Sequence, residues 1–181
     1  MIKIENITIR EPRISDIVKL IKWYHSLSDE SKRFFHPFPE TASNPYFILA
    51  LIMLLLSCIK ILRRILLKIL PQLIYISLCS IYSNEVVGFA FIKLKNQYYG
   101  ELGIGIRDDF QGMGLGSKLM DNLIKVAQRE GLKKIRLTVL TDNYRAIRLY
   151  EKFGFKKSKF IKDCDIYKGK KYDCFEMLLD L

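Results

Sequence analysis

Apolar and polar residues alternate in several short segments of the chain, and this period of two predicts β-strands. In the first segment, 7–10, every second position from residue 7 is isoleucine, and Pro12 then ends the pattern. Two longer runs, 74–82 and 86–94, are rich in β-branched and aromatic residues and are separated by three polar residues, which predicts an antiparallel hairpin. Further strands are predicted at 101–106, at 135–139 and on both sides of the turn at 167–171.

Apolar residues spaced three or four positions apart predict helices between these strands. The first helix follows Ser15, a candidate cap, and a loop with three prolines over 26–45 comes after it. A longer helix is predicted over 114–131 and a short one over 143–154, each closed by a glycine. The candidate caps of the short helix are Asp142 and Asn143.

The order of these elements is a strand, a helix, a loop, a second helix, three strands, a helix, a strand, a helix and two strands. This order predicts a mixed sheet with a strand–helix–strand crossover in its middle, so the expected fold class is α/β (α+β). A length of 181 residues suits a single domain, 1–181, with a hydrophobic core of its own.

The segment 46–70 is unusual because it is apolar without interruption through Leu56 and basic afterwards. Wound as a helix, its second half has a polar side formed by Ser57, Lys60, Arg64 and Lys68. The wholly apolar part is shorter than the ~20 residues that span a bilayer, and a spanning helix would separate strands of one sheet. Three alternatives stay open, namely a helix lying on a membrane surface, burial in the core and a dimer contact.

Composition narrows the class of protein. With 50% hydrophobic and 27% charged residues the chain is neither disordered nor of low complexity. The formal net charge of +11 attracts polyanions, so nucleic acid, anionic lipid and a phosphate-rich cofactor are candidate partners, beside the alternative of a solvated basic surface. We expect no nucleic-acid partner, since no recognition motif accompanies the charge.

Cysteine and histidine usage argues against a metal site. The four cysteines form no C-x-x-C pair and there are two histidines, so no metal is expected. The N-terminus lacks the apolar core and cleavage site of a secretory signal. We therefore expect a cytoplasmic protein with reduced thiols, whose cysteines serve as small core residues.

Residues 111–118 read QGMGLGSK and lie between the strand predicted at 101–106 and the following helix. The first backbone N–H groups of a helix have no intrahelical partner and bind anions. Glycines remove the Cβ atoms that would hold a phosphate away, so this segment predicts a cradle for a diphosphate. Its spacing matches neither the P-loop nor the dinucleotide-binding fingerprint.

The run QGMGLG, 111–116, resembles the acetyl-CoA pyrophosphate loop of the GNAT superfamily of N-acetyltransferases. A second run, NYRAIRLYEKFGF at 143–155, resembles the family segment with an Asn, an Ala, a Leu-Tyr pair and a closing Gly-Phe. The resemblance covers about residues 72–181 strongly and 1–35 in pattern only, while 46–70 is longer and more apolar than the family's second helix. It implies a GNAT-type mixed, mostly antiparallel sheet with a central β-α-β crossover flanked by helices.

The resemblance also implies a chemistry, in which a primary amine attacks the thioester of acetyl-CoA directly and no metal takes part. Tyr150 matches the tyrosine that donates a proton to the leaving thiolate. Glu101, at the head of its strand, is the first candidate for the base, with Tyr99 and His36 as alternatives. The residues implied to bind the co-substrate acetyl-CoA are Ile104, Gly105, Ile106, Gln111, Gly112, Met113, Gly114, Leu115, Gly116, Ser117 and Asn143.

The acceptor amine stays open between a small molecule, an amino sugar and a protein N-terminus. Phe34, Phe35 and Phe38 flank His36 and are expected either to line the acceptor pocket or to cover the core. The alternative function is a non-catalytic CoA-binding or membrane-surface regulatory module of the same fold. A homodimer and a peripheral membrane contact through 46–70 are further open alternatives.

Overall fold

The computed structural model describes residues 4–35 and 75–181 of the chain. The segment 46–70 and the candidate base His36 lie outside these residues, so the predictions made for them stay predictions. None of the helices within the described residues is long and apolar enough to cross a membrane.

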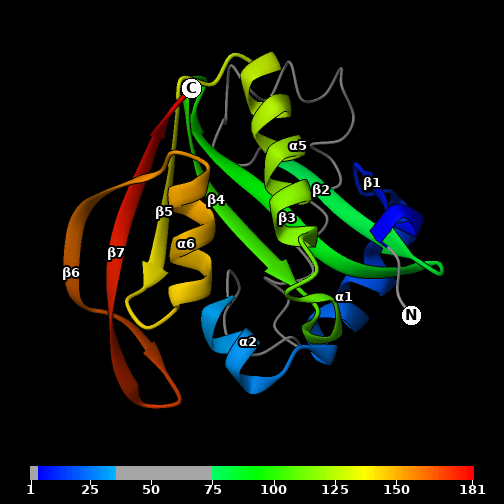
Figure 1. The fold of residues 1–181 in the computed structure, drawn as a ribbon, viewed down its shortest axis with the longest axis horizontal. Coiled ribbons are helices and arrows are strands. Elements are labelled where there is room, and N and C mark those ends of the chain that lie inside the picture. Colours follow the sequence, from blue (N-terminus) through cyan, green and yellow to red (C-terminus); the bar gives the residue numbers. More distant parts are fainter. Residues whose placement is uncertain (1–3, 36–74) are drawn as a thin grey trace.

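Seven strands of the described residues form one sheet. They are β1 (Thr8–Arg10), β2 (Tyr75–Tyr82), β3 (Glu85–Asn96), β4 (Tyr99–Ile106), β5 (Lys134–Leu140), β6 (Lys156–Tyr167) and β7 (Lys170–Asp180). Their order in the sheet is β1-β2-β3-β4-β5-β7-β6 (Figure 1). Neighbouring strands are antiparallel except β4 and β5, which are parallel. The mixed, mostly antiparallel sheet with a central crossover is therefore confirmed.

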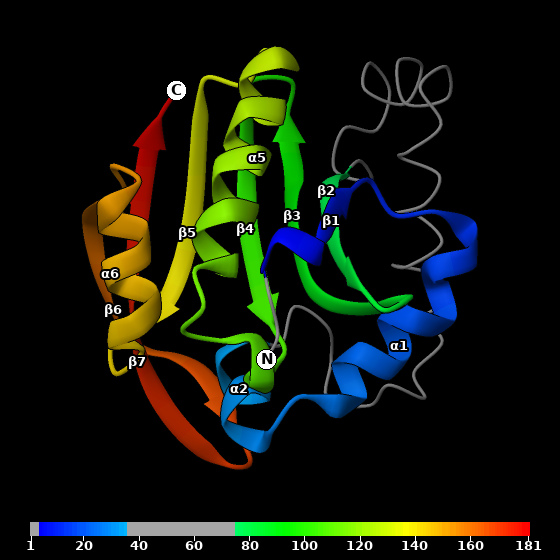
Figure 2. The ribbon, with the colours of Figure 1, turned by 45° about the vertical axis from the view of Figure 1, so that its right-hand side comes forward.

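Helices cover both faces of the sheet (Figures 1 and 2). They are α1 (Ile17–Ser26), α2 (Asp29–Phe34), α5 (Leu115–Arg129) and α6 (Tyr144–Lys152). Helix α5 makes the crossover between β4 and β5, and it packs with α6 on one face. Helix α1 packs on the opposite face.

Strand β3 shows how the sheet divides the core. Ala90 and Ile92 pack in the cluster under α5, whereas Phe89 and Phe91 pack in the cluster under α1 with Trp23. Side chains alternate between the two faces of a strand, so a strand covered on both faces reads as an unbroken apolar run. Residues 86–92 are accordingly all buried.

The turn between β2 and β3 and the predicted ends of α5 and α6 agree with the structure. The two-residue turn 83–84 between β2 and β3 has φ angles of 47° and 65°, the left-handed geometry that suits a tight hairpin. Asn143 caps α6, because its Oδ1 accepts a hydrogen bond from the backbone N–H of Ala146 at 3.1 Å. Gly131 and Gly154, with φ of 84° and 90°, close α5 and α6.

The prediction that Ser15 caps α1 is wrong. Residues 14–16 form a 3-10 turn, and α1 begins after Asp16. The carboxylate of Asp16 is buried, accepts a hydrogen bond from the backbone N–H of Arg13 at 2.7 Å and pairs with the guanidinium of Arg10 at 2.6 Å. This pairing holds the turn against β1 and leaves Ser15 exposed.

The prediction of a loop over 26–45 is also wrong for residues 26–35, the part that the structure describes, because α2 lies there. Ser28 caps this helix, and its Oγ accepts a hydrogen bond from the backbone N–H of Ser31 at 3.2 Å. The sequence carries the signal, a serine followed by two acidic residues that suit the positive end of a helix. The prolines at 37 and 39, which break regular structure, led to the prediction of a loop over the whole segment.

One pair of cysteines is oxidised, which differs from the prediction that all cysteines are reduced core residues. A disulfide joins Cys164 of β6 to Cys174 of β7, with the two Cα atoms 5.9 Å apart. The β6–β7 ladder is irregular between Ile161 and Asp165, and this bulge brings Cys164 diagonally opposite Cys174. Cys79 is buried, in agreement with the prediction.

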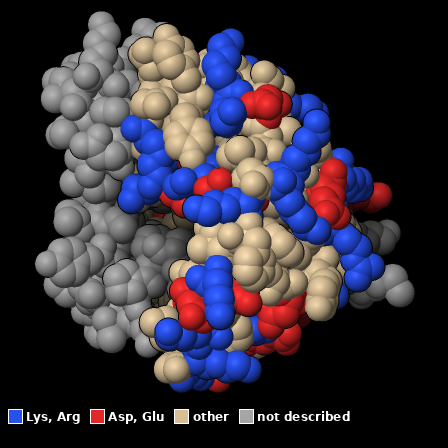
Figure 3. Space-filling view, turned by 90° about the vertical axis from the view of Figure 1, so that its left-hand side faces the viewer, with Lys and Arg blue, Asp and Glu red and all other residues tan. Residues whose placement is uncertain are grey.

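Part of the basic charge lies on the edge of the sheet. Lysine and arginine side chains are spread over the side formed by β6, β7 and α6, with acidic groups between them (Figure 3). Edge strand β6 carries exposed lysines at 156, 157, 159 and 162. Charged side chains on an edge strand oppose pairing with another chain, so these lysines need no ligand to explain them.

Candidate active site

The main feature of the candidate site is the parting of the two parallel strands. Strands β4 and β5 pair only over Tyr99–Glu101 and Lys134–Arg136. Beyond these pairs, Ile104–Ile106 of β4 and Thr138 and Val139 of β5 line a cavity of about 700 Å³. Main-chain groups of β4 that would otherwise bond to β5 therefore face a space that a ligand can fill.

The glycine-rich loop forms one end of this cavity. Gly112 and Gly114 have φ of 75° and 86°, a left-handed geometry that favours glycine. Helix α5 begins directly after Gly114, so the backbone N–H groups of Gly116 and Ser117 lie in its first turn, where no intrahelical acceptor exists. A Cβ built at Gly112 would have no atom within 4 Å, so this part of the loop faces open space.

Basic side chains of α6 line the same cavity and make it suitable for an anion. They are Arg145, Arg148 and Lys152. Together with the positive end of α5 they provide charge complementary to phosphate groups. The cavity therefore suits a long ligand with phosphates at one end and a strand-like portion beside β4.

Most of the residues predicted to bind the co-substrate come together here. The lining includes Ile104, Gly105, Ile106, Gln111, Gly112, Gly114, Gly116, Ser117 and Asn143. Met113 and Leu115 do not line the cavity, and the side chain of Leu115 is buried in a separate cluster with Ile7, Val87 and Phe110. Any contact of Leu115 with a ligand in this cavity would have to come from its backbone.

The side chain of Gln111 forms hydrogen bonds within the protein. Its Nε2 donates hydrogen bonds to the backbone O of Ile106 and to Ser31 Oγ, both at 3.0 Å. Its Oε1 accepts a hydrogen bond from Arg145 Nη1 at 2.7 Å. Gln111 therefore ties the first residue of the loop to the end of β4, to α2 and to α6.

Tyr150 of α6 lines this cavity and is buried, with 7% of its surface exposed. Its ring packs against Phe155 with the centroids 5.8 Å apart. Burial raises the pKa of the Tyr150 phenol well above its ordinary value, because the phenolate would lose its hydration. The phenol is therefore a proton donor and not an anion over the physiological pH range.

Glu101 lines a second cavity, of about 450 Å³, that does not include Tyr150. Its carboxylate pairs with Lys95 Nζ at 2.8 Å and with Arg136 Nη2 at 3.5 Å. Burial alone would raise the pKa of Glu101, but the hydrogen bond from Lys95 and the nearby charges outweigh it and lower the pKa. Tyr99, the alternative base, lines neither cavity, and burial raises the pKa of its phenol.

The two cavities have a common wall made of Phe34, Phe35 and Thr138. Phe34 is the last residue of α2 and Phe35 follows it, so the end of this short helix lies where the cavity of Tyr150 adjoins the cavity of Glu101. Arg33 of α2 pairs with Asp142, before α6, at 2.6 Å. Both alternatives expected for these phenylalanines fit the structure, because Phe34 and Phe35 line the cavities and Phe35 also packs in the core cluster under α1. Phe38 lies outside the described residues.

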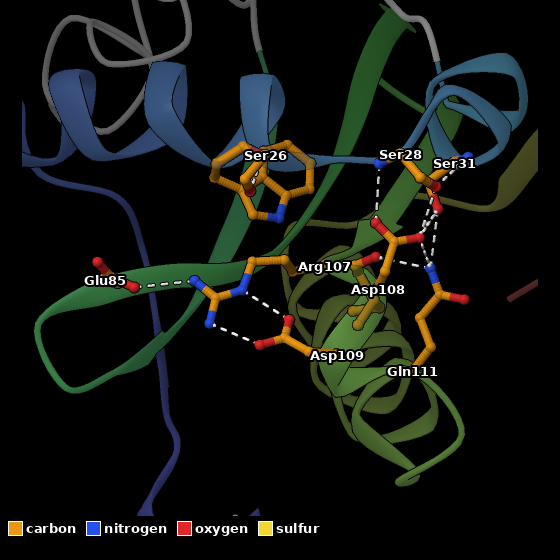
Figure 4. Close-up of polar contacts among 10 residues, drawn as sticks. Ser26, Ser28, Ser31, Glu85, Arg107, Asp108, Asp109 and Gln111 are labelled. Carbon is orange, nitrogen blue, oxygen red and sulfur yellow. Dashed lines mark hydrogen bonds and ion pairs between the residues drawn. The ribbon is translucent and has the colours of Figure 1, made fainter.

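Sequence reasoning missed the polar residues that hold α2 in place. Asp108, between β4 and the glycine-rich loop, accepts hydrogen bonds from Ser28 and Ser31 (Figure 4). Among the described residues, no cluster of three histidine, cysteine, aspartate or glutamate side chains is arranged to hold a metal ion.

Comparison with known proteins identifies the same family as the two motifs. A model of the acetyltransferase (GNAT) family matches residues 61–155, just over half of the chain. The spermine/spermidine N(1)-acetyltransferase of Bacillus subtilis is 36% identical over 83 residues, which are 41% of this chain and 55% of that protein. A mycothiol acetyltransferase of Streptomyces coelicolor is 37% identical over 74 residues, 40% of this chain and 24% of that protein. The matched region thus spans about half of the first relative and about a quarter of the second.

A solved structure of a putative acetyltransferase from Salmonella typhimurium, determined with its cofactor acetyl-CoA, has the same fold. The TM-score is 0.75 at 23% sequence identity, and the alignment covers 97% of this chain and 94% of that one.

Proposed function

Because the chain belongs to the GNAT acetyltransferase family, we propose that it moves the acetyl group of acetyl-CoA to a primary amine by direct attack. The observation that carries this proposal is the parting of β4 and β5 directly after Glu101 and Arg136. It opens the main chain of Ile104–Ile106 to a cavity that also contains the glycine-rich start of α5. Acetyl-CoA supplies an acetyl group activated as a thioester.

The residues present fit this co-substrate. The backbone N–H groups at 112–117 suit its two linked phosphates, since they lie at the positive end of α5. Arg148 and Lys152 of α6 suit the remaining phosphate charge. The main chain of Ile104–Ile106 suits an extended arm with amide groups, because β5 does not pair with this part of β4.

In the proposal, Tyr150 donates its phenolic proton to the leaving sulfur. A positioned acid of this kind contributes ~10² to 10⁴-fold to the rate. Support comes from its place in the cavity wall beside β4 and from the burial that keeps the phenol protonated. Asn143 lines the same cavity, but its side-chain oxygen is used in capping α6, so we assign it a positional role.

Glu101 is proposed to receive the proton of the acceptor's ammonium group, directly or through water. Its lowered pKa keeps it ionised, so its oxygens can accept a hydrogen bond from an ammonium group. The same lowered pKa makes it a weak base. We therefore expect transfer to be fastest at a pH where part of the amine is already neutral.

The acceptor is proposed to be a small cationic amine that enters the cavity of Glu101. Two acidic residues, Glu101 and Asp165, line that cavity together with two basic ones, Arg33 and Lys93. Its apolar walls, Phe91 and Phe35, suit the alkyl chain of an amine. The Bacillus subtilis relative is named for spermine and spermidine, so polyamines are the first acceptors to try. Amino sugars and protein N-termini are the other classes to compare.

The proposal is tested by measuring thiol release from acetyl-CoA with a panel of polyamines, amino sugars and peptides. We expect at least one amine to be acetylated, with the product confirmed by mass. If acetyl-CoA binds but no amine in the panel is acetylated, and Tyr150→Phe changes nothing, the chain is a CoA-binding module of the same fold.

A further inference from the structure

A cluster of polar side chains connects α2 to the glycine-rich loop. Asp108, in the 3-10 turn that follows β4, accepts hydrogen bonds from three donors at the start of α2. These are the backbone N–H of Ser28 at 3.0 Å, its Oγ–H at 2.8 Å and the Oγ–H of Ser31 at 2.6 Å. The sequence separations are 80 and 77 residues, so only the folded chain brings these groups together.

The cluster continues into the loop itself. Ser31 Oγ donates to Asp108 and accepts a hydrogen bond from Gln111 Nε2 at 3.0 Å. Gln111 is the residue directly before Gly112, and it is also bonded to Ile106 and Arg145. Figure 4 shows Asp108, Ser28, Ser31 and Gln111 turned toward one another. The loop and the first turn of α2 therefore belong to one hydrogen-bond network.

The charge of Asp108 is unusual for its position. A carboxylate three residues before an anion-binding loop would repel phosphate if its charge were not compensated. Asp108 is instead surrounded by hydrogen-bond donors of α2 and by Gln111, and it contacts no basic side chain among the described residues. Its chemistry suits holding α2 and not binding the phosphates.

Helix α2 in turn shapes the space for the acceptor. Its last residue, Phe34, and the following Phe35 line both cavities. Arg33, on the same short helix, pairs with Asp142 on the far side of the parted strands. The helix therefore bridges the gap between β4 and β5, fastened at its start by Asp108 and near its end by Asp142.

We propose that Asp108 is a positioning residue that couples the coenzyme loop to α2, so that filling the loop with coenzyme stabilises the acceptor cavity. The inference rests on the proposed function, since it takes CoA as the ligand of the loop. It adds that the two cavities are energetically linked through the contact of Asp108 with Ser28 and Ser31. Binding at one cavity then strengthens binding at the other by the same factor.

The neighbouring Asp109 provides a matched control. It lies in the same 3-10 turn, but it pairs with Arg107 at 2.8 and 3.0 Å and points away from α2 (Figure 4). Asp109→Asn removes one carboxylate from the turn without touching the cluster. Asp108→Asn removes the negative charge that the donors of Ser28 and Ser31 share, so their hydrogen bonds to residue 108 are no longer charge-assisted.

The experiment is hydrogen–deuterium exchange of the full chain with and without saturating CoA, followed by mass spectrometry. In the wild type and in Asp109→Asn, we expect CoA to slow exchange in peptides over 112–117 and over 29–34. In Asp108→Asn and in the milder Ser31→Ala, we expect CoA still to slow exchange over 112–117. The extra slowing that CoA causes over 29–34 should fall about tenfold, the size of effect expected when a hydrogen bond to a charged group is lost or weakened. Ser31→Thr keeps the hydroxyl and is expected to restore the wild-type pattern.

Each outcome decides the inference. Protection of 112–117 without any added protection of 29–34 in the wild type would overturn the coupling and leave the proposed function standing. Equal protection of 29–34 in the wild type and in Ser31→Ala would assign the cluster to static support of the fold. No protection of either segment by CoA would overturn the proposed function, and the coupling with it.

Discussion

Glu101 and Arg136 form the last residue pair of the parallel β4–β5 ladder, and their side chains meet with Arg136 Nη2 3.5 Å from Glu101 Oε1. Arg136 also reaches Glu176 of β7 with its Nη1 3.4 Å from Glu176 Oε2. Lys95 of β3 completes this row of charges. The row crosses the sheet where the two strands part, so it holds their paired ends together and places Glu101 at the edge of the opening.

Replacing Glu101 by Gln tests its proposed role. We expect kcat to fall about 10²-fold, because the amide does not accept the ammonium proton. Because its pKa is lowered, Glu101 takes up a proton only below the ordinary glutamate pKa of about 4.3. We therefore expect activity to fall between pH 8 and pH 6 through protonation of the acceptor amine alone. The same fall should persist in Glu101→Gln. The measurement is the pH profile of kcat/KM with the best acceptor of the panel.

Glu176→Gln is the matched control for that substitution. Glu176 contacts the same arginine but lines neither cavity. We expect it to keep kcat near the wild-type value. An equal loss in both variants would mean that the row of charges supports the strands and that Glu101 takes no proton.

Tyr150→Phe is expected to lower kcat by about 10² to 10⁴-fold with little change in the affinity for acetyl-CoA, because only the proton donor is removed. Burial raises the pKa of this phenol, so its protonated form persists beyond pH 10, the ordinary value for tyrosine. The wild type should accordingly show no loss of kcat from Tyr150 up to pH 10. Steady-state kinetics and calorimetric binding of acetyl-CoA separate the two effects.

The exposed Tyr98, in the turn between β3 and β4, serves as control for the loss of a phenol. Tyr98→Phe should be as active as the wild type. A Tyr150→Phe variant that keeps full kcat would exclude this phenol as the donor.

Gly112→Ala is expected to weaken acetyl-CoA binding about tenfold or more, because the added methyl group and the shifted loop disturb N–H groups that bind charged phosphates. Strain from the left-handed φ of 75° is expected to lower stability by about 1–2 kcal/mol as well. Calorimetric titration with acetyl-CoA gives the dissociation constant, and thermal unfolding gives the stability.

Gly131→Ala separates the two effects in that experiment. Gly131 has φ of 84°, and a Cβ there would also meet nothing within 4 Å, but it lies at the far end of α5 and outside the cavity. We expect the same loss of stability with unchanged affinity for acetyl-CoA. Equal affinities of the two variants would argue against the glycine loop as the phosphate site.

Asp16→Ala tests the fastening of the N-terminal segment to the sheet. Asp16 is buried and bonded to Arg10 at 2.6 and 3.0 Å, and loss of one partner of such a pair costs about 3 kcal/mol. The hydrogen bond from Arg10 lowers the pKa of Asp16, so its contribution is present above about pH 3.9 and is lost as the pH falls through the lower folded value. Urea unfolding between pH 7 and pH 2 measures both effects.

The exposed Glu11 is the control in that series, and Glu11→Ala should change the free energy of unfolding by less than about 0.5 kcal/mol. If Asp16→Ala unfolds at the wild-type urea concentration at pH 7, the buried pair does not hold the N-terminal segment.

The order of strands and helices was predictable because each depends on neighbours in the sequence. The glycine ends at Gly131 and Gly154 and the cap at Asn143 follow from local backbone chemistry, and the structure confirms them. Helix α2 was missed although Ser28 and the two acids after it are a cap signal. A helix of six residues has too few apolar positions to show a period, so its stability depends on packing.

The sequence by itself determined the family, the glycine-rich start of α5 and the identity of the proposed donor Tyr150, since short runs of adjacent residues carry these signals. Only the tertiary structure decided that Glu101 and Tyr150 line different cavities that adjoin at the end of α2, and that Asp108 joins this helix to the glycine-rich loop. The physical reason is that hydrogen bonds and ion pairs act over a few ångströms in space, whereas Arg33 and Asp142 are 109 residues apart along the chain.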